Sequence, residues 1–266
     1  PVVRLVQPSI AQSAKWDEAE RDRIFKTYLD LTAQPPAEGK AKPTLVVWPE
    51  TAVPFIFSDR PDALSALGGL LDNSQILLAG AVRQEGVREN GDVVRYYNSM
   101  LAINGSGEIY DASDKVHLVP FGEYLPLDGL LRMAGLHEIV TTPGGFSAGP
   151  RLKPLEIPGI GRVLPMICYE IIFPGVASKV LPRPDLIVNM TNDAWYGRTP
   201  GPWQHFRLAQ LQAVESGLPV IRAANNGISG VIDGHGRVIA ALGVDAIGAI
   251  DVPFLQSGTL TVYSTA

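Results

Sequence analysis

The stretch Leu164-Pro165-Met166-Ile167-Cys168-Tyr169-Glu170 is an apolar run of strand length that leads directly into a thiol and a carboxylate. Cys168 is the single cysteine among 266 residues, so it cannot form a disulfide within the chain. A free cysteine is either a small buried hydrophobic residue or a nucleophile, and burial is the commoner role. The residues that accompany it elsewhere in the chain decide between these roles.

Similar apolar or β-branched runs recur along the chain and alternate with segments of helical spacing. Strands that are apolar on both faces and alternate with helices favour a layered α/β sandwich over an all-β fold. The predicted strands are residues 2–6, 44–48, 76–82, 97–103, 162–168, 185–190, 219–223, 229–232 and 246–252, and the predicted helices are residues 14–31, 60–71 and 203–215.

Residues 101–110 and 231–239 each show a strand, a glycine-containing turn and a second strand, which is typical of a hairpin. One such hairpin in each half of the chain suggests two similar sheets. Hairpins with glycine turns are common, so a true internal repeat and two unrelated hairpins both stay open.

The bulk composition is that of a globular chain, with 46% hydrophobic and 18% charged residues, and its length fits one domain over residues 1–266. A net charge of −5 gives no electrostatic reason to expect a nucleic-acid partner. No apolar run approaches the roughly 18 residues that span a bilayer, so this chain alone is expected to be soluble. The start at Pro1, without a methionine, suggests a processed chain or a piece of a longer protein.

Residues 125–153 form the least regular stretch, where glycines and prolines surround apolar side chains. Long apolar loops of this kind are uncommon and are often lids or binding loops. We therefore expect a lid here; the alternative is a helix and loop that pack on the core.

An attacking thiol needs a base to take its proton and a cation to stabilise the negative charge that develops. Glu50, at the end of the apolar run 44–48, and Lys115 have the chemistry for these two tasks. The usual alternative partner of a cysteine is histidine, but none of the four histidines lies in a papain-like pattern. The chain shows neither metal-ligand spacing nor a glycine-rich nucleotide loop, so we expect no metal and no cofactor.

Three motifs of this chain resemble those of a known enzyme superfamily. Trp48-Pro49-Glu50, Lys115 with the following His117-Leu118-Val119-Pro120-Phe121-Gly122-Glu123, and Cys168-Tyr169-Glu170 resemble, in that chain order, the Glu-Lys-Cys triad of the nitrilase (carbon–nitrogen hydrolase) superfamily. More narrowly, residues 47–52, 117–126, 167–170, 192–197, 201–206 and 222–227 are similar to the catalytic domain of the bacterial apolipoprotein N-acyltransferase family. The Pro-Phe-Gly-Glu block and the Gly-Pro-Trp-Gln-His block distinguish this branch from ordinary amidases.

The resemblance implies a four-layer α-β-β-α sandwich of the nitrilase type. It also implies an acyltransferase in which Cys168 takes an acyl chain from a phospholipid as a thioester. The acceptor would be the α-amine of the diacylglyceryl-cysteine of an apolipoprotein. The family carries this domain among membrane helices that this chain lacks, so the resemblance places it at the bacterial inner membrane, on the periplasmic side. The apolar segment 125–140 is then the candidate for contact with lipid.

The same resemblance assigns roles to individual residues. Glu50 would be the general base, Lys115 the oxyanion stabiliser and Cys168 the nucleophile. Glu123 would orient Lys115, while Tyr169 and Glu170 would support the thiol. A buried charge such as that of Glu170 is costly unless it is paired, so we expect a partner for it.

Four further residues are candidates for the pocket, each with a structural alternative. Asn192 either shapes the pocket or forms an ordinary turn after a strand. Trp195 and Trp203 line an acyl tunnel or pack in the core, and His205 belongs to the same motif as Trp203.

Two other functions stay open at this point. A soluble carbon–nitrogen hydrolase could cleave a small amide or nitrile with the same triad. A catalytically inactive binding module would retain Cys168 only as a core residue, but it would have no need of all three triad residues.

Overall fold

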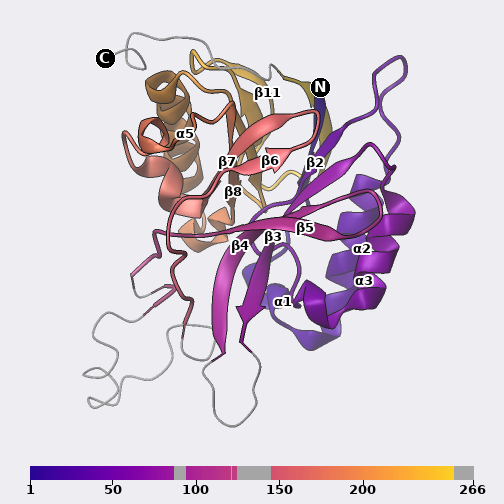
Figure 1. The fold of residues 1–266 in the computed structure, drawn as a ribbon. Helices are drawn as coiled ribbons and strands as arrows, with labels where there is room; N and C mark the ends of the chain where they lie inside the picture. The colour runs from indigo at the N-terminus through magenta and orange to yellow at the C-terminus, as the bar shows by residue number, and fades with distance from the viewer. Residues whose placement is uncertain (87–93, 121, 125–144, 255–266) are drawn as a thin grey trace, which may run out of the picture.

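The computed structural model describes residues 1–86, 94–120, 122–124 and 145–254. Within these residues two six-stranded sheets pack face to face, with helices on their outer faces (Figure 1). No helix in the described ranges is long and apolar enough to cross a membrane.

The first sheet has the order β12-β1-β2-β3-β4-β5. The central strands β1, β2 and β3 are parallel, whereas β12, β4 and β5 join by antiparallel pairing. Helices α2 (Arg21–Thr32) and α3 (Pro61–Leu70) cover its outer face (Figure 1). The strands are β1 (Val2–Gln7), β2 (Leu45–Val47), β3 (Ile76–Glu85), β4 (Arg95–Ile103), β5 (Ile109–Asp114) and β12 (Gly248–Pro253).

The second sheet has the order β11-β10-β9-β8-β7-β6, with β7, β8 and β9 parallel at its centre. Helix α5 (Gly201–Ser216) packs on its outer face through Phe206, Ala209 and Ala213. The strands are β6 (Leu155–Ile157), β7 (Gly161–Ile167), β8 (Leu186–Thr191), β9 (Val220–Ala224), β10 (Ser229–Ile232) and β11 (Val238–Leu242).

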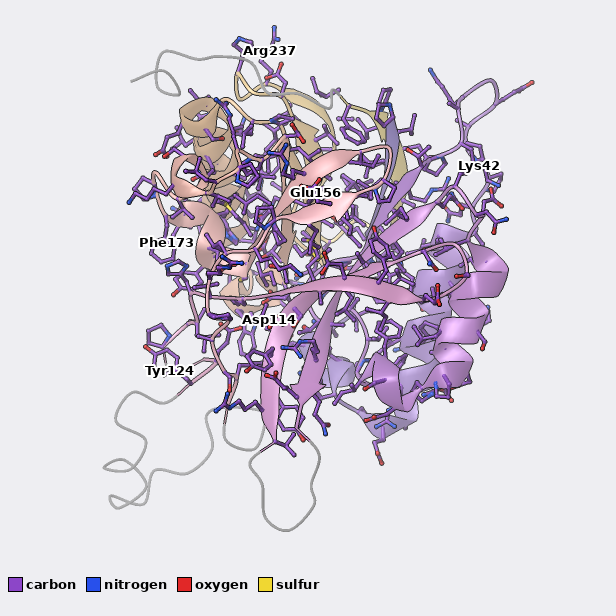
Figure 2. All side chains as sticks on the ribbon, viewed as in Figure 1. Lys42, Asp114, Tyr124, Glu156, Phe173 and Arg237 are labelled. Atoms are coloured by element: carbon purple, nitrogen blue, oxygen red, sulfur yellow. The ribbon has the colours of Figure 1, made fainter. Side chains whose placement is uncertain are left out.

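The main core lies between the two sheets, where inward-facing residues of β1, such as Val3 and Leu5, share one cluster with Val163 and Ile167 of β7. Because helices cover the other face of each sheet, the central strands are buried on both sides. In Figure 2 side chains fill the space between the sheets, while charged residues such as Lys42 and Arg237 lie at the periphery. The predicted four-layer α-β-β-α sandwich is confirmed.

Most predicted strands and both hairpins (β4–β5 and β10–β11) are confirmed, but the prediction of one helix over residues 14–31 is wrong. The segment contains α1 (Gln12–Lys15), the short η1 (Glu18–Glu20) and then α2. The break occurs at Asp17, whose carboxylate accepts a hydrogen bond from the amide of Ala19 at 2.9 Å and so begins a new helical turn. Trp16, within this segment, is 40% exposed.

The predicted lid, residues 125–153, lies largely outside the described residues; only its end, 145–153, is described. The prediction that strand 162–168 includes Cys168 is also wrong by one residue. β7 ends at Ile167, and Cys168 and Glu170 belong to the short helix η3 (Cys168–Ile172).

Gly80 of β3 permits a close approach between this strand and the backbone that leads to Glu50. A Cβ at position 80 would lie 2.3 Å from the carbonyl oxygen of Pro49 and 2.6 Å from Cα of Glu50. Ala52 donates its amide to the Gly80 carbonyl at 2.7 Å, so the turn that carries Glu50 is fastened directly onto β3.

Gly80→Ala is expected to lower the free energy of unfolding by about 1–3 kcal/mol, because the added methyl group forces this contact apart. Equilibrium urea denaturation measures the change. Gly69→Ala on α3 is the matched control, since nothing lies within 4 Å of its added Cβ. There alanine is expected to be neutral or to stabilise by up to about 1 kcal/mol. Equal destabilisation of both variants would contradict the interpretation.

Candidate active site

The predicted catalytic residues converge at the carboxyl ends of the strands. Cys168 follows β7 immediately, Asn192 follows β8, Lys115 follows β5, and Glu50 comes three residues after β2. β7 and β8 are parallel neighbours, so their carboxyl ends open at the same edge of the second sheet. Such an edge is where open α/β sheets place their ligands.

Cys168 occupies a strained turn between β7 and η3. Its φ is 54°, in the left-handed region that a non-glycine residue rarely adopts. The side chain is half-buried, and its Sγ lies 3.6 Å from the hydroxyl of Thr191. Cys168 packs against the edge of the core between the sheets and also borders a cavity. Backbone strain of this kind persists only where surrounding contacts hold it.

Glu170 supplies such contacts. Its Oε2 accepts the amide of Ile167 at 2.8 Å, and its Oε1 accepts the amides of Val116 and His117 at 2.8 and 2.9 Å. The residue is 2% exposed; burial raises the pKa of its carboxyl, while these amide hydrogen bonds act in the opposite direction. Glu170 therefore has the predicted partners, and it connects the turn at Cys168 to the segment that follows Lys115.

Lys115 lies in an almost fully buried cluster of charges. Its Nζ is 2.9 Å from Oε1 of Glu123 and 3.4 Å from Oε1 of Glu50. Burial alone would lower the pKa of the ammonium, but the negative charges of Glu50, Cys168 and Glu123 outweigh it and raise that pKa. The lysine therefore remains a cation. Tyr169 lies over it, with the ring centre 5.7 Å from Nζ, and donates its hydroxyl to the carbonyl of Leu118.

Asn98 of β4 joins the two carboxylates that flank Lys115, and the sequence analysis missed it. Its Nδ2 donates to Oε1 of Glu50 at 2.7 Å and to Oε1 of Glu123 at 2.9 Å. Glu50 also accepts the amide of Asn192 on Oε2 at 3.0 Å. The signal was present in the sequence, since Asn98 and Ser99 interrupt an otherwise apolar strand.

The thiol is held in its protonated form by this environment. Burial, followed by the negative charge of Glu50, raises the pKa of Cys168 to about 12, whereas Lys115 and the Thr191 hydroxyl lower it. At neutral pH the sulfur therefore carries its proton until a base removes it. Glu50, with both oxygens fixed by hydrogen bonds, has the chemistry for that role.

A cavity of about 330 Å³ opens in front of these groups. Its walls include Asn192 and Trp195 among the predicted pocket residues. Trp16, Trp195 and Tyr196 contribute to the wall and are 40%, 64% and 37% exposed, which gives the cavity an aromatic rim. Its residues are Gln12, Trp16, Glu50, Thr51, Asn98, Lys115, Val119, Gly122, Glu123, Phe146, Cys168, Tyr169, Asn192, Trp195 and Tyr196.

The other two pocket candidates do not border this cavity. Trp203 is 55% exposed near the start of α5. His205 is buried; its Nδ1 lies 2.9 Å from Oδ1 of Asp193 and its Nε2 lies 3.3 Å from the carbonyl oxygen of Cys168. The histidine thus contacts the turn that carries the thiol from beneath.

Asp193 links this histidine to Thr191, whose hydroxyl contacts the Cys168 sulfur. Its Oδ1 accepts the Thr191 hydroxyl at 3.0 Å, and its Oδ2 forms an ion pair with the buried guanidinium of Arg222 at 2.9 Å. Burial alone would raise the pKa of Asp193, but Arg222 and His205 hold that pKa below its usual range. Gly227 leaves room for this carboxylate, because a Cβ there would lie 2.0 Å from Oδ2.

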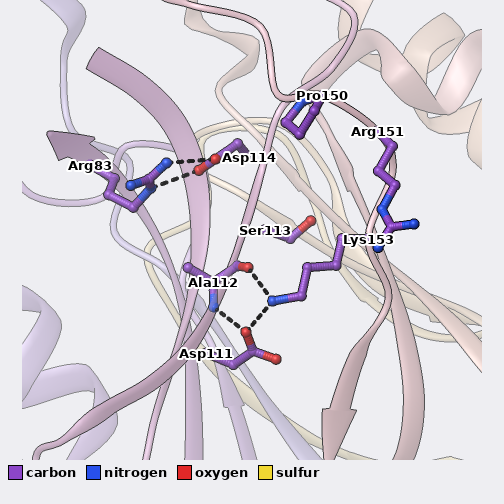
Figure 3. Close-up of a pocket in the computed structure, with 8 residues that line it drawn as sticks. All are labelled: Arg83, Asp111, Ala112, Ser113, Asp114, Pro150, Arg151 and Lys153. Atoms are coloured by element: carbon purple, nitrogen blue, oxygen red, sulfur yellow. Dashed lines mark hydrogen bonds and ion pairs between the residues drawn. The ribbon is translucent and has the colours of Figure 1, made fainter. Parts of the chain in front are cut away.

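A second cavity, of about 470 Å³, lies at β5, just before Lys115 (Figure 3). Figure 3 shows that Arg83 binds Asp114 through two hydrogen bonds, of 2.9 and 2.7 Å. Lys153 binds the carboxylate of Asp111 and the carbonyl of Ala112. These cations are paired with carboxylates of β5, so they fasten the strand that delivers Lys115.

Among the residues that the structure describes, no group of three or more histidine, cysteine, aspartate or glutamate side chains could hold a metal ion.

Glu50→Gln is expected to accelerate the reaction of Cys168 with dithiodipyridine at neutral pH. Removal of the negative charge lowers the pKa of the thiol. Each pKa unit raises the thiolate fraction about tenfold, but the thiolate becomes less nucleophilic as its pKa falls, so the rate should rise about three- to fourfold per unit. Absorbance of the released thiopyridone measures it on the single thiol. Glu18→Gln, at an exposed surface position, is the control and should not change the rate. A slower reaction of Glu50→Gln would contradict the inference that the negative charge of Glu50 raises the pKa of the thiol.

Comparison with known proteins agrees with this fold. A sequence model of the Carbon-nitrogen hydrolase family matches residues 2–257. The chain is 53% identical over 249 residues to the apolipoprotein N-acyltransferase of Brucella melitensis, which covers 94% of the chain and 47% of that protein. It is also 53% identical over 266 residues to the enzyme of that name from Rhizobium etli, covering 99% and 50%. The chain thus spans about half the length of the curated relatives it matches.

Two solved structures are similar in fold. An amidase from Nesterenkonia sp. has a TM-score of 0.64 at 18% identity, with 99% of this chain and 92% of that one covered. A member of the nitrilase superfamily from Saccharomyces cerevisiae has a TM-score of 0.63 at 19% identity, with 94% and 88% covered. From the family match over almost its entire length, the chain belongs to the carbon–nitrogen hydrolase family.

Proposed function

We propose that the chain is the catalytic domain of an apolipoprotein N-acyltransferase. It would move an acyl chain from a phospholipid, through a thioester on Cys168, to the α-amine of the diacylglyceryl-cysteine of an apolipoprotein. The observation that carries this proposal is the 53% identity to enzymes of that name over 94–99% of the chain. The charge cluster and the aromatic-rimmed cavity support it.

The first half-reaction assigns each group one task. Glu50 takes the proton from Sγ as the sulfur attacks the ester carbonyl carbon of the phospholipid. The ammonium of Lys115 stabilises the oxyanion of the tetrahedral intermediate. When the ester C–O bond breaks, the departing lysophospholipid oxygen takes the proton from Glu50, and the thioester remains.

The second half-reaction uses the same groups in return. The amine of the acceptor attacks the thioester carbonyl, Glu50 accepts a proton from the amine nitrogen, and Lys115 again faces the oxyanion. Collapse breaks the C–S bond, forms the amide and returns the proton from Glu50 to sulfur. The raised pKa of Cys168 ensures that this proton comes to rest on the thiol.

The supporting residues position these three. Glu123 binds the ammonium of Lys115, and Asn98 donates to the carboxylate of Glu50, so these two side chains set the relative positions of the cation and the general base. Glu170 fixes the turn of Cys168 relative to the segment that follows Lys115. Trp16, Trp195 and Tyr196 at the rim give an apolar surface for the acyl chain. A thioester survives until the amine arrives only where water is kept away, and an aromatic rim suits that need.

We also propose an inner-membrane location with the domain on the periplasmic side. The support is the resemblance to a membrane enzyme family together with relatives about twice as long as this chain. Contact of segment 125–140 with lipid remains part of this proposal, because that segment lies outside the described residues.

The test is to incubate the chain with phosphatidylethanolamine or phosphatidylglycerol in mixed detergent micelles, so that the donor can reach the cavity without a membrane segment. Intact-mass spectrometry should show one acyl adduct that hydroxylamine removes, as expected of a thioester. A peptide with an N-terminal diacylglyceryl-cysteine should then discharge the adduct and gain an amide-linked chain.

Variants separate the proposal from its rivals. Glu50→Gln and Lys115→Ala should each abolish acylation while circular dichroism shows a folded protein. An adduct that still forms on Cys168→Ala would disprove the thioester route. No adduct, together with ammonia release from short amides, would favour a carbon–nitrogen hydrolase instead.

A further inference from the structure

Lys15 is a buried lysine beside the active site that the mechanism above does not use. It lies at the end of α1, between Gln12 and Trp16, both of which border the cavity. The side chain is 3% exposed, and its Nζ donates to the backbone carbonyl of Glu50 at 3.0 Å. That carbonyl is the one acceptor that the ammonium contacts within the described part of the chain. A buried lysine with so few partners is expensive to keep charged.

The carbonyl that Lys15 binds belongs to a strained turn. Thr51, the next residue, has a φ of 41°, in the left-handed region. Gly80 of β3 lies against the same turn, so closely that the backbone of Pro49 and Glu50 leaves no room for a Cβ. The turn is therefore held between β3 and the Lys15 side chain, and its geometry determines where the Glu50 carboxylate lies.

Lys15 also affects the charge balance of the site. Glu50 and Glu123 contribute two negative charges, whereas Lys115 contributes one positive charge. A positive charge on Lys15 offsets the second of these two negative charges while the thiol is protonated. Without it, an ionised sulfur would face a cluster that is already net negative.

We propose that Lys15 is a positioning residue that holds the Glu50 turn and supplies the second cation of the active site, so that the reactivity of Cys168 depends on the protonation of Lys15. The proposal rests on Glu50 and Cys168 acting as base and nucleophile, and it does not depend on which acyl donor or acceptor the enzyme uses.

The proton equilibrium of Lys15 supports this role. Burial lowers the pKa of Lys15 to about 8, while the charge of Glu50 and the interaction with Cys168 in its thiolate form act in the opposite direction. Lys115, the other cation of the cluster, lies on the carboxylate side of Glu50. Below about pH 8 Lys15 is an ammonium that favours the thiolate; above it the neutral amine no longer does so. The effect of Lys15 on the thiol should fade as pH rises.

The test compares the wild-type chain, Lys15→Met and Lys15→Arg by their rates with dithiodipyridine from about pH 6 to about pH 10. At about pH 7 the wild type should react about three- to fourfold faster than Lys15→Met, the effect of one pKa unit of the thiol once the lower nucleophilicity of the more acidic thiolate is included. This ratio should fall toward one above about pH 8, as wild-type Lys15 loses its charge. Lys15→Arg, which stays charged, should match the wild type at low pH and exceed it at high pH.

The pH dependence of this ratio distinguishes an effect of the Lys15 charge from a purely structural effect of the substitution. A wild-type to Lys15→Met ratio that is the same at every pH, or equal to one throughout, would overturn the proposal even if Lys15→Arg does not fold. Lys26→Met on α2 is the control, because Lys26 is exposed and paired with Asp30. No acyl substrate enters this assay, so its failure is distinct from failure of the phospholipid reaction.

Discussion

The constraint on which the site depends is the burial of Glu50, Glu123 and Lys115 in one contact group. Removing such charges from water costs several kcal/mol each, and mutual attraction offsets the cost only with good geometry and further hydrogen bonds. Asn98 provides those bonds by donating to both carboxylates from β4. Each of the three charges thus offsets part of the desolvation cost of the other two, and the strands that carry them must be placed accurately relative to one another. The close contact at Gly80 and the ion pairs along β5 hold these strands in their relative positions.

A second constraint acts on the nucleophile. The left-handed backbone at Cys168 is unfavourable by itself, so the surrounding contacts must over-determine it. Glu170 binds the amide before the thiol and two amides after Lys115, while His205 reaches the Cys168 carbonyl from α5. The thiol and the ammonium of Lys115 are consequently fixed to each other through Glu170, although 52 residues of sequence separate Lys115 from residue 167. The three amide hydrogen bonds of Glu170 therefore offset the cost of burying its carboxylate at this position.

Much of the fold could be predicted because each strand carries its own apolar pattern, and the paired hairpins carry their glycine turns. The triad was predicted from its motifs. Asn98 and Lys15 were missed for a physical reason: their importance comes from partners 48 and 35 residues away, which no local pattern reports. The broken helix at residues 14–31 was missed because the capping of Asp17 overrides a helical period that is otherwise continuous. That break matters, since it turns Trp16 toward the cavity and leaves Lys15 beneath Glu50.

The raised pKa of the thiol and the positive charges beside it have opposite effects on the sulfur as a nucleophile and as a leaving group. A two-step transfer needs both. A sulfur of high pKa is a strong nucleophile once deprotonated but a poor leaving group when the amine displaces it. Positive charge near the sulfur shifts this balance toward departure. Glu50 carries one proton within each step, from sulfur to the lysophospholipid oxygen in the first and from the amine to sulfur in the second. An enzyme that must both form and break a thioester therefore needs a base that holds one proton and cations that compensate two carboxylates. Lys115 alone compensates one of them, and the buried ammonium of Lys15 is placed to compensate the other.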